Sequence, residues 1–395
     1  MLRDDDPADE SAFELELPPE PHAPDDPADP VSRRRADIDA KQALIATVLA
    51  DLSCDGAILL MPSHVAWFTG GMTSRGLIAD TDRPGVYSTG RARWLLCANT
   101  DTRRLFDEEL DQLGFQLKEW QWPTGRAVLL GELVSGKSVA ADRPFPNLKL
   151  VNDRLRADMR PLLPFDTERY DALGADLVHA VEATARNCAA GDTEAEIAGQ
   201  VAHRLCRRGA EPVALSVTAD GRGKAYRRAG YTDAAATATC LVQATAVRHG
   251  LHATCSRTVC FGEPAGELRA EFDAAVKLAA LYRLASVPGG TVAAAVEGGR
   301  GLLAGGPFAE EWRLALPGYG AGWFAAEELR RLGGDEPFLA GQPITWQARV
   351  GAAAVVDTVV VAGNSGRCVS PPAGWPFRRV LARGQTLEIP DLLVR

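Results

Sequence analysis

Three side chains near the middle of the chain have the chemistry of metal ligands. His249, His252 and Cys255 lie in the segment 240–264, which reads CLVQATAVRHGLHATCSRTVCFGEP. Imidazole and thiolate groups commonly bind zinc and other transition metals. On a strand, however, residues an odd number of positions apart point to opposite faces, so His249 and His252 do not converge. We therefore predict no metal site here, and His252 is either a pocket residue or a structural histidine.

A glycine-rich segment later in the chain has some features of a dinucleotide-binding loop. Gly318, Gly320 and Gly322 follow the apolar run Leu314–Leu316. The third glycine comes one residue too early for the dinucleotide fingerprint, and no second strand ending in an acidic residue follows. Glycines in strands also let backbones approach closely, and we favour that interpretation. No cofactor is therefore predicted.

The segment that carries the histidines is predicted to be a β-hairpin. Residues 241–247 and 251–261 are rich in β-branched and small side chains, which favour strands. Between them, Arg248, His249 and Gly250 are expected to form the turn, because glycine readily adopts a positive φ.

The remaining elements indicate two domains of different class. Up to about residue 150, strands alternate with helices, which predicts an α/β domain. Later, helix pairs are followed by antiparallel strands, which predicts an α+β domain. Thr193 and Glu196 fit a capping box at the start of one helix. The expected helices are 37–52, 101–113, 126–133, 167–188, 192–207, 267–286 and 325–332, and the expected strands outside the hairpin are 56–61, 94–97, 115–122, 138–141, 213–218, 344–350 and 355–361.

Composition limits the possible partners and location. The chain has 395 residues and a net charge of -9, which disfavours nucleic acid as a partner. Residues 1–35 are rich in Asp, Glu and Pro, so we expect a disordered tail that is either solubilising or docks on a partner. No apolar run is long enough for a transmembrane helix, and no membrane association is expected. Eight scattered cysteines without a CxxC pair suggest a reduced, cytoplasmic protein.

Four segments in the second half of the chain resemble motifs of the creatinase, Xaa-Pro aminopeptidase and methionine aminopeptidase family. They occur in the same order as in that family. They are Gly250-Leu251 with Ser256-Arg257-Thr258 and Gly262-Glu263-Pro264, then 317–323 (PGYGAGW), 344–348 (ITWQA) and 356–361 (VDTVVV). The resemblance implies an α+β pita-bread domain over 156–395. It also implies a smaller creatinase-type α/β domain over 36–155, after the tail of residues 1–35.

The same resemblance implies that the metal site of this family is degenerate here. Active members hold two divalent cations with two Asp, a His and two Glu, which activate water for amide hydrolysis. The matching positions are Gln243 or Ala244, Thr254, Pro317 or Gly318, Gln347 and Val356. None of these is a carboxylate or an imidazole, and Asp357 is expected to point to the opposite face of its strand. The histidine of creatinase matches Arg228, which stays protonated and cannot act as a base.

The polar residues that remain define a predicted ligand pocket without metal. Arginines in it favour an anionic group such as a carboxylate. For Arg257 a structural ion pair within the domain is an equal alternative. The predicted pocket residues are Arg228, His252, Thr254, Arg257, Tyr319, Gln347 and Thr358.

These observations lead to two hypotheses of function. The first is a non-catalytic pseudopeptidase that binds a small carboxylate or peptide ligand or serves as a scaffold. The alternative is a metal-independent hydrolase of a small peptidic or amidino C–N bond, because fold alone does not settle function. The resemblance also implies a homodimer.

Overall fold

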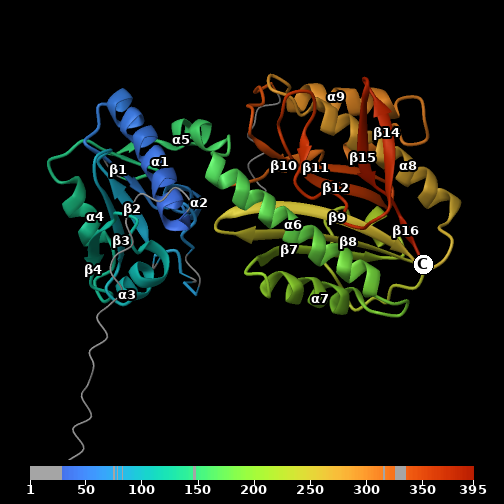
Figure 1. Ribbon diagram of the computed structural model, residues 1–395, viewed down its shortest axis with the longest axis horizontal. Coiled ribbons are helices and arrows are strands. Elements are labelled where there is room, and N and C mark those ends of the chain that lie inside the picture. Colours follow the sequence, from blue (N-terminus) through green and yellow to red (C-terminus); the bar gives the residue numbers. More distant parts are fainter. Residues whose placement is uncertain are drawn as a thin grey trace, which may run out of the picture.

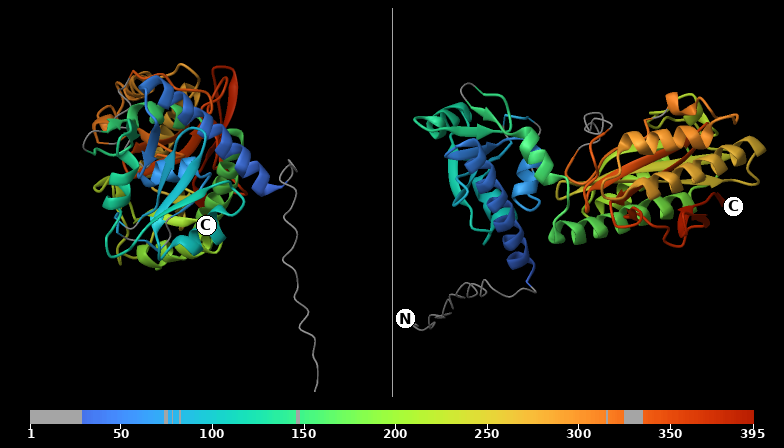
Figure 2. Two further views of the ribbon diagram at one scale, coloured as in Figure 1. Left: turned by 90° about the vertical axis from the view of Figure 1, so that its left-hand side faces the viewer. Right: turned by 90° about the horizontal axis from the view of Figure 1, so that it is seen from above.

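The computed structural model describes residues 29–73, 76–77, 79–81, 83–145, 148–314, 316–324 and 335–395. They form a smaller α/β part and a larger α+β part, which lie side by side (Figure 2). The predicted fold class is confirmed. Most of the predicted tail, residues 1–28, and the helix predicted over 325–332 lie outside the described residues. The predicted domain boundary at 155–156 falls inside helix α5 (Asn152–Met159) and stays a prediction.

The N-terminal part is built on one six-stranded sheet with the order β4-β3-β2-β1-β5-β6. Strands β1 and β5 are parallel, as are β3 and β4, whereas β2 is antiparallel to both of its neighbours. The strands are β1 (Gly56–Leu59), β2 (Gly85–Ser88), β3 (Arg93–Ala98), β4 (Gln116–Trp120), β5 (Val139–Ala141) and β6 (Lys149–Leu150). The helices before α5 are α1 (Pro30–Leu52), α2 (Pro62–Phe68), α3 (Thr102–Arg104), the π-helical turn η1 (Leu105–Leu110) and α4 (Ala127–Val134).

Helix α1 begins seven residues earlier than the sequence pattern predicted. The Asp29 carboxylate accepts a hydrogen bond from the Ser32 N–H at 2.9 Å, and Pro30 occupies the first turn. An acidic N-cap followed by proline is a common helix start, because it satisfies or removes N–H groups that have no partner in the helix. Residues 30–35 are therefore helical and do not belong to a disordered tail.

A buried lysine joins the two parts of the chain. Lys41 of α1 is fully buried, and its Nζ lies 2.6 Å from Asp37 and 3.0 Å from Asp166 of helix α6 (Pro164–Asn187). The same ammonium lies 4.9 Å from the centre of the Trp323 ring. Two carboxylates and an aromatic face compensate its desolvation. Lys41 therefore fixes α1 against the C-terminal part.

The C-terminal part is built on an eight-stranded sheet. Its main path is β10-β11-β12-β9-β8-β7, while β13 pairs with β12 and β16 pairs with β9. Its helical elements after α6 are α7 (Glu194–Cys206), η2 (Arg222–Lys224), α8 (Gly266–Ala285), α9 (Val292–Leu303) and η3 (Glu311–Arg313). Its strands are β7 (Glu211–Ala219), β8 (Thr239–Arg248), β9 (Leu251–Cys260), β10 (Gly318–Gly320), β11 (Pro343–Val350), β12 (Ala353–Val360), β13 (Arg367–Cys368) and β16 (Leu393–Val394), with a separate hairpin of β14 (Phe377–Ala382) and β15 (Gln385–Pro390).

The predicted central hairpin and capping box are both confirmed. Strands β8 and β9 pair from Thr239–Cys260 to Arg248–Leu251, and His249 and Gly250 form the turn with φ of 54° and 80°. Gly250 is also required sterically, because a Cβ there would lie 2.5 Å from the Ala66 side chain. At α7, Thr193 and Glu196 exchange the reciprocal hydrogen bonds of a capping box.

Helices cover only one face of the main sheet over β8, β9, β11 and β12 among the described residues. Helix α6 packs against β8 and β9, whereas α8 packs against β11 and β12, so the helices flank different parts of one curved sheet (Figure 1). Trp346 of β11 stacks on Tyr282 of α8 at 4.7 Å, and Arg257 of β9 contacts Glu182 of α6. We call this helix-covered side the outer face. Because side chains alternate along a strand, the intervening residues form the opposite side, which we call the inner face.

The sheet is curled so that the inner face is concave. Leu241 of β8 packs against Ala354 and Val356 of β12, although β9 lies between the two strands. Neighbouring strands lie about 4.8 Å apart, so β8 and β12 would be nearly 10 Å apart in a flat sheet. Side chains from strands that are not neighbours therefore meet on the inner face.

Arg257 lies on the outer face, not in the predicted pocket. Its guanidinium is fully buried and donates to Glu182 Oε1 at 2.9 Å and to Asp357 Oδ1 at 3.2 Å. It also donates to the carbonyl oxygens of Ser256 and Ser370. Burial alone would lower the pKa of Arg257, but Asp357 and Glu182 raise it overall. The structural ion pair is thus the alternative that this arrangement favours.

This arrangement predicts a large loss of stability on removing the Arg257 charge. Arg257→Met leaves two buried carboxylates without their cation, which should lower the free energy of unfolding by about 3–5 kcal/mol. The control is Arg379→Met on β14, whose side chain is 71% exposed. Exposed substitutions of this kind change stability by about 0.5 kcal/mol or less. Urea unfolding of both variants is the measurement, and equal effects would contradict a structural role for Arg257.

Candidate functional site

Four positions that the family resemblance matches to metal ligands lie on the inner face of one sheet. Gln347 of β11 pairs directly with Val356 of β12. Gln243 of β8 pairs with Ser256 of β9, which is two residues from Thr254 and so points to the same side. The strand register therefore places Gln243, Thr254, Gln347 and Val356 on one face of the sheet.

The glycine-rich strand contributes a tyrosine to this face. Gly318 pairs with Trp346, whose side chain is on the outer face, whereas Tyr319 pairs with Thr345. The Tyr319 hydroxyl donates to Thr254 Oγ1 at 3.0 Å, and Thr254 Oγ1 lies 2.9 Å from Thr245 Oγ1. Burial raises the pKa of Tyr319, so it remains a neutral phenol. Tyr319, and not Pro317 or Gly318, thus presents its side chain at the site.

Thr358 holds the two halves of the sheet together beside Thr254. Its hydroxyl accepts from the Thr254 N–H and donates to the Thr254 carbonyl, both at 2.9 Å. It also lies 2.8 Å from the Thr345 hydroxyl. All three threonine side chains are buried. The hydroxyl of Thr358 therefore replaces backbone hydrogen bonds between β9 and β12, and it has a structural task as well as a place at the site.

Arg349, the one cation on the inner face of the described strands, was not among the predicted pocket residues. Its Nη2 donates to Gln243 Oε1 at 2.5 Å, and its Nε donates to Gln347 Oε1 at 3.2 Å. The Arg349 guanidinium thus lies between Gln243 and Gln347, two of the positions that the family resemblance matches to metal ligands. A signal was present, because Arg349 is two residues after Gln347 on the same strand and must share its face.

His252 lies at the edge of this face and is half-buried. Its backbone pairs with Gly322, and its Nδ1 lies 3.3 Å from the Gly322 carbonyl oxygen. A carbonyl accepts a hydrogen bond, so Nδ1 carries the proton and Nε2 keeps its lone pair. Burial lowers the pKa of His252, which favours the neutral imidazole. The contacts with Gly322 give His252 a structural role, and its place in a pocket stays a prediction.

Arg228 is not placed in a pocket. It is exposed in the loop after η2, whereas its neighbour Arg227 is half-buried. Arg227 donates to the Gly351 carbonyl at 2.6 Å and to Glu311 at 2.9 Å, next to the turn between β11 and β12. The conformation of the loop decides whether Arg227 or Arg228 turns inward, and the sequence does not predict that conformation. Arg227 therefore lies nearer the inner face than Arg228.

These residues do not fit a pair of divalent cations. Hydrolytic two-metal sites need bridging carboxylates, and hard cations prefer charged oxygen ligands. Here the matching side chains are amides, hydroxyls and an apolar valine. Within the described ranges, no group of three or more His, Cys, Asp or Glu is placed to hold a metal ion. The Arg349 guanidinium would also repel a second cation.

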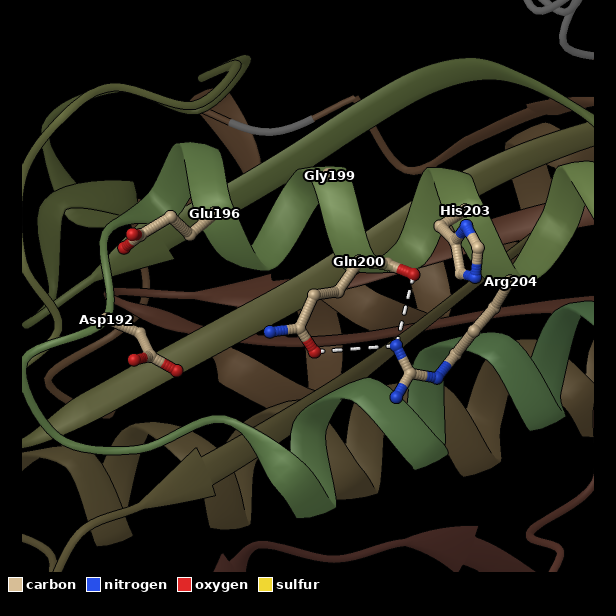
Figure 3. Close-up of a pocket in the computed structure, with 6 residues that line it drawn as sticks. All are labelled: Asp192, Glu196, Gly199, Gln200, His203 and Arg204. Carbon is tan, nitrogen blue, oxygen red and sulfur yellow. Dashed lines mark hydrogen bonds between the residues drawn. The ribbon is translucent and has the colours of Figure 1, made fainter.

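A groove of 560 Å³ runs along α7 on the surface (Figure 3). Arg204 is bonded to the carbonyl and side chain of Gln200, and Glu196 belongs to the capping box. Glu196 and His203 are seven residues apart on one helix, or about 10 Å along its axis. The groove therefore brings no acid and base together, and local helix contacts explain its polar groups.

A cavity of 880 Å³ lies in the N-terminal part. Its lining includes Trp120, Trp122 and Phe145. Two arginines in the lining, Arg126 and Arg143, share the carboxylate of Asp80. Their charge is thus partly neutralised, and the cavity is separate from the inner face described above.

Comparisons with known proteins show the fold of the chain. The sequence matches no protein-family model and no curated protein. Among solved structures, dipeptidase PepE from Mycobacterium ulcerans is 18% identical with a TM-score of 0.71, covering 91% of this chain and 98% of that one. Prolidase from Pyrococcus horikoshii is 16% identical with a TM-score of 0.72, covering 85% and 99%. The N-terminal domain of the FACT complex subunit SPT16 from chickpea is 10% identical with a TM-score of 0.62, covering 85% and 96%.

Identities this low show the fold alone. None of the described helices is long and apolar enough to cross a membrane. The chain therefore has the fold of the dipeptidases and prolidases compared above.

Proposed function

We propose that this protein is a metal-free, non-catalytic relative of the pita-bread peptidases that binds a ligand on its inner face. The observation that carries the proposal is the Arg349 guanidinium bonded to Gln243 and Gln347. Amide hydrolysis needs an activated water, which in this fold would come from metal ions held by carboxylates. The matching positions supply neutral side chains and a fixed positive charge instead.

The fold itself is compatible with a role other than catalysis. One solved structure that shares it is named as a subunit of the FACT complex and not as a peptidase. Function resides in the site that a fold carries, so the similarity to dipeptidases does not by itself imply hydrolysis. A small carboxylate or a peptide is the ligand class that we propose.

One observation keeps a second function open, a metal-independent hydrolase of a small peptidic or amidino C–N bond. His252 has a neutral ring whose Nδ1 faces the Gly322 carbonyl, and it lies two residues from Thr254 on the same side of β9. A neutral imidazole near pH 7 can act as a general base.

An activity assay separates the two functions. The purified protein should release no product above background from glycyl-proline or creatine, with or without added Mn²⁺ or Co²⁺, because no activated water forms. Proline or sarcosine release is the measurement, with an active prolidase assayed in parallel as the control. Turnover by the parent chain that His252→Gln or Thr254→Ala abolishes would establish the hydrolase and overturn the non-catalytic proposal.

From the resemblance we propose a homodimer, and from the composition we propose a cytoplasmic protein that binds neither nucleic acid nor membrane. Light scattering of the purified protein should give twice the mass of one 42.2 kDa chain. A mass of one chain would contradict the dimer.

A further inference from the structure

Arg349 is a buried positive charge without an acidic partner in the part of the chain that the structure describes. The residue is 7% exposed, and its two printed hydrogen bonds go to the neutral amide oxygens of Gln243 and Gln347. Other buried cations of this protein, such as Lys41 and Arg257, face two carboxylates each. Burial lowers the pKa of Arg349 to about 10, so it stays protonated at neutral pH.

A buried charge of this kind is costly unless another group compensates it. Removing an ion from water costs several kcal/mol, and amide dipoles recover only part of this. A guanidinium has five N–H donors, of which these bonds use two. Arg349 therefore has both unbalanced charge and donors to spare.

The surroundings of Arg349 favour an anion over any other ligand. Gln243 and Gln347 accept from Arg349 through their oxygens, so their amide NH₂ groups are turned to other partners. Glu311, an acid next to the turn after β11, is engaged by Arg227 and by the Gly351 N–H. Both glutamines are half-buried, so the face retains access to solvent. Among the described residues, the inner-face positions of β8, β9, β11 and β12 thus include donors and no acidic side chain.

We propose that Arg349 anchors the carboxylate group of a ligand on the inner face. This deepens the binding role proposed above and rests on it. A carboxylate presents two oxygens in a plane, which matches two parallel N–H groups of a guanidinium. The ligand class is a small carboxylic acid or a peptide with a free C-terminus. The anchor is then a residue that replaces the metal ions as the positive charge of the site.

The test compares acetate with acetamide, which have nearly the same shape but differ in charge. Binding to the parent chain, Arg349→Gln and Arg349→Lys is measured by saturation-transfer NMR on the ligand methyl group at constant ionic strength. A charge-assisted hydrogen bond predicts that acetate binds the parent chain at least about tenfold more tightly than acetamide. The preference should fall to about one in Arg349→Gln and be partly kept in Arg349→Lys, which retains charge but not the planar fork.

Arg228→Gln is the matched control, because Arg228 is an exposed arginine of a nearby loop and should leave the preference unchanged. Circular dichroism checks that each variant is folded. If Arg349→Gln does not fold, the preference of the parent chain for acetate over acetamide still tests the proposal. Equal binding of acetate and acetamide by the parent, or an undiminished preference in folded Arg349→Gln, would overturn the anchor. Tighter binding of inorganic phosphate than of acetate would overturn the carboxylate assignment. None of these outcomes depends on turnover, so they are separate from the test of the non-catalytic role.

Discussion

The buried ion cluster of Arg257, Glu182 and Asp357 is the constraint on which the arrangement of the C-terminal sheet depends. It joins α6 to both β9 and β12, the two central strands where the halves of the sheet meet. A guanidinium with two carboxylates and two carbonyls satisfied can be buried only in one geometry. Because strand side chains alternate, fixing Arg257 and Asp357 outward also fixes Thr254, Thr358 and their neighbours inward.

The inner face that results carries hydroxyls, amides and one guanidinium. The Tyr319 hydroxyl donates to the Thr254 hydroxyl, and the Thr358 hydroxyl bonds the Thr254 N–H and carbonyl. The positive charge on this face is the Arg349 guanidinium, which is part of the protein and cannot dissociate. At 4 Å and an effective dielectric constant of about 20, two unit charges repel by about 4 kcal/mol, and a divalent ion doubles this. A protein that carries its own cation here therefore opposes metal binding and favours anions.

Much of this fold could be predicted from the sequence, and the exceptions have physical reasons. The β8–β9 hairpin, the capping box of α7 and the outward direction of Asp357 follow from local patterns with strict periods. The start of α1 was missed although Asp29 and Pro30 signalled it, because the acidic, proline-rich stretch before them dominated the composition. Arg228 was predicted to line the pocket but is exposed. It lies in a loop, where side chains do not alternate regularly between inward and outward directions. Arg349 was missed because it matches no family motif, and only its parity with Gln347 marks it as a residue of the site.

The central claim, that a guanidinium takes the place of the metal pair, is tested most directly by metal content. The purified protein is dialysed against Mn²⁺, then against metal-free buffer, and the metal that remains is measured by elemental analysis. With amide and hydroxyl ligands beside Arg349, the chain should retain less than about 0.1 equivalent of Mn²⁺. Retention of one or two equivalents that survive dialysis would contradict the account.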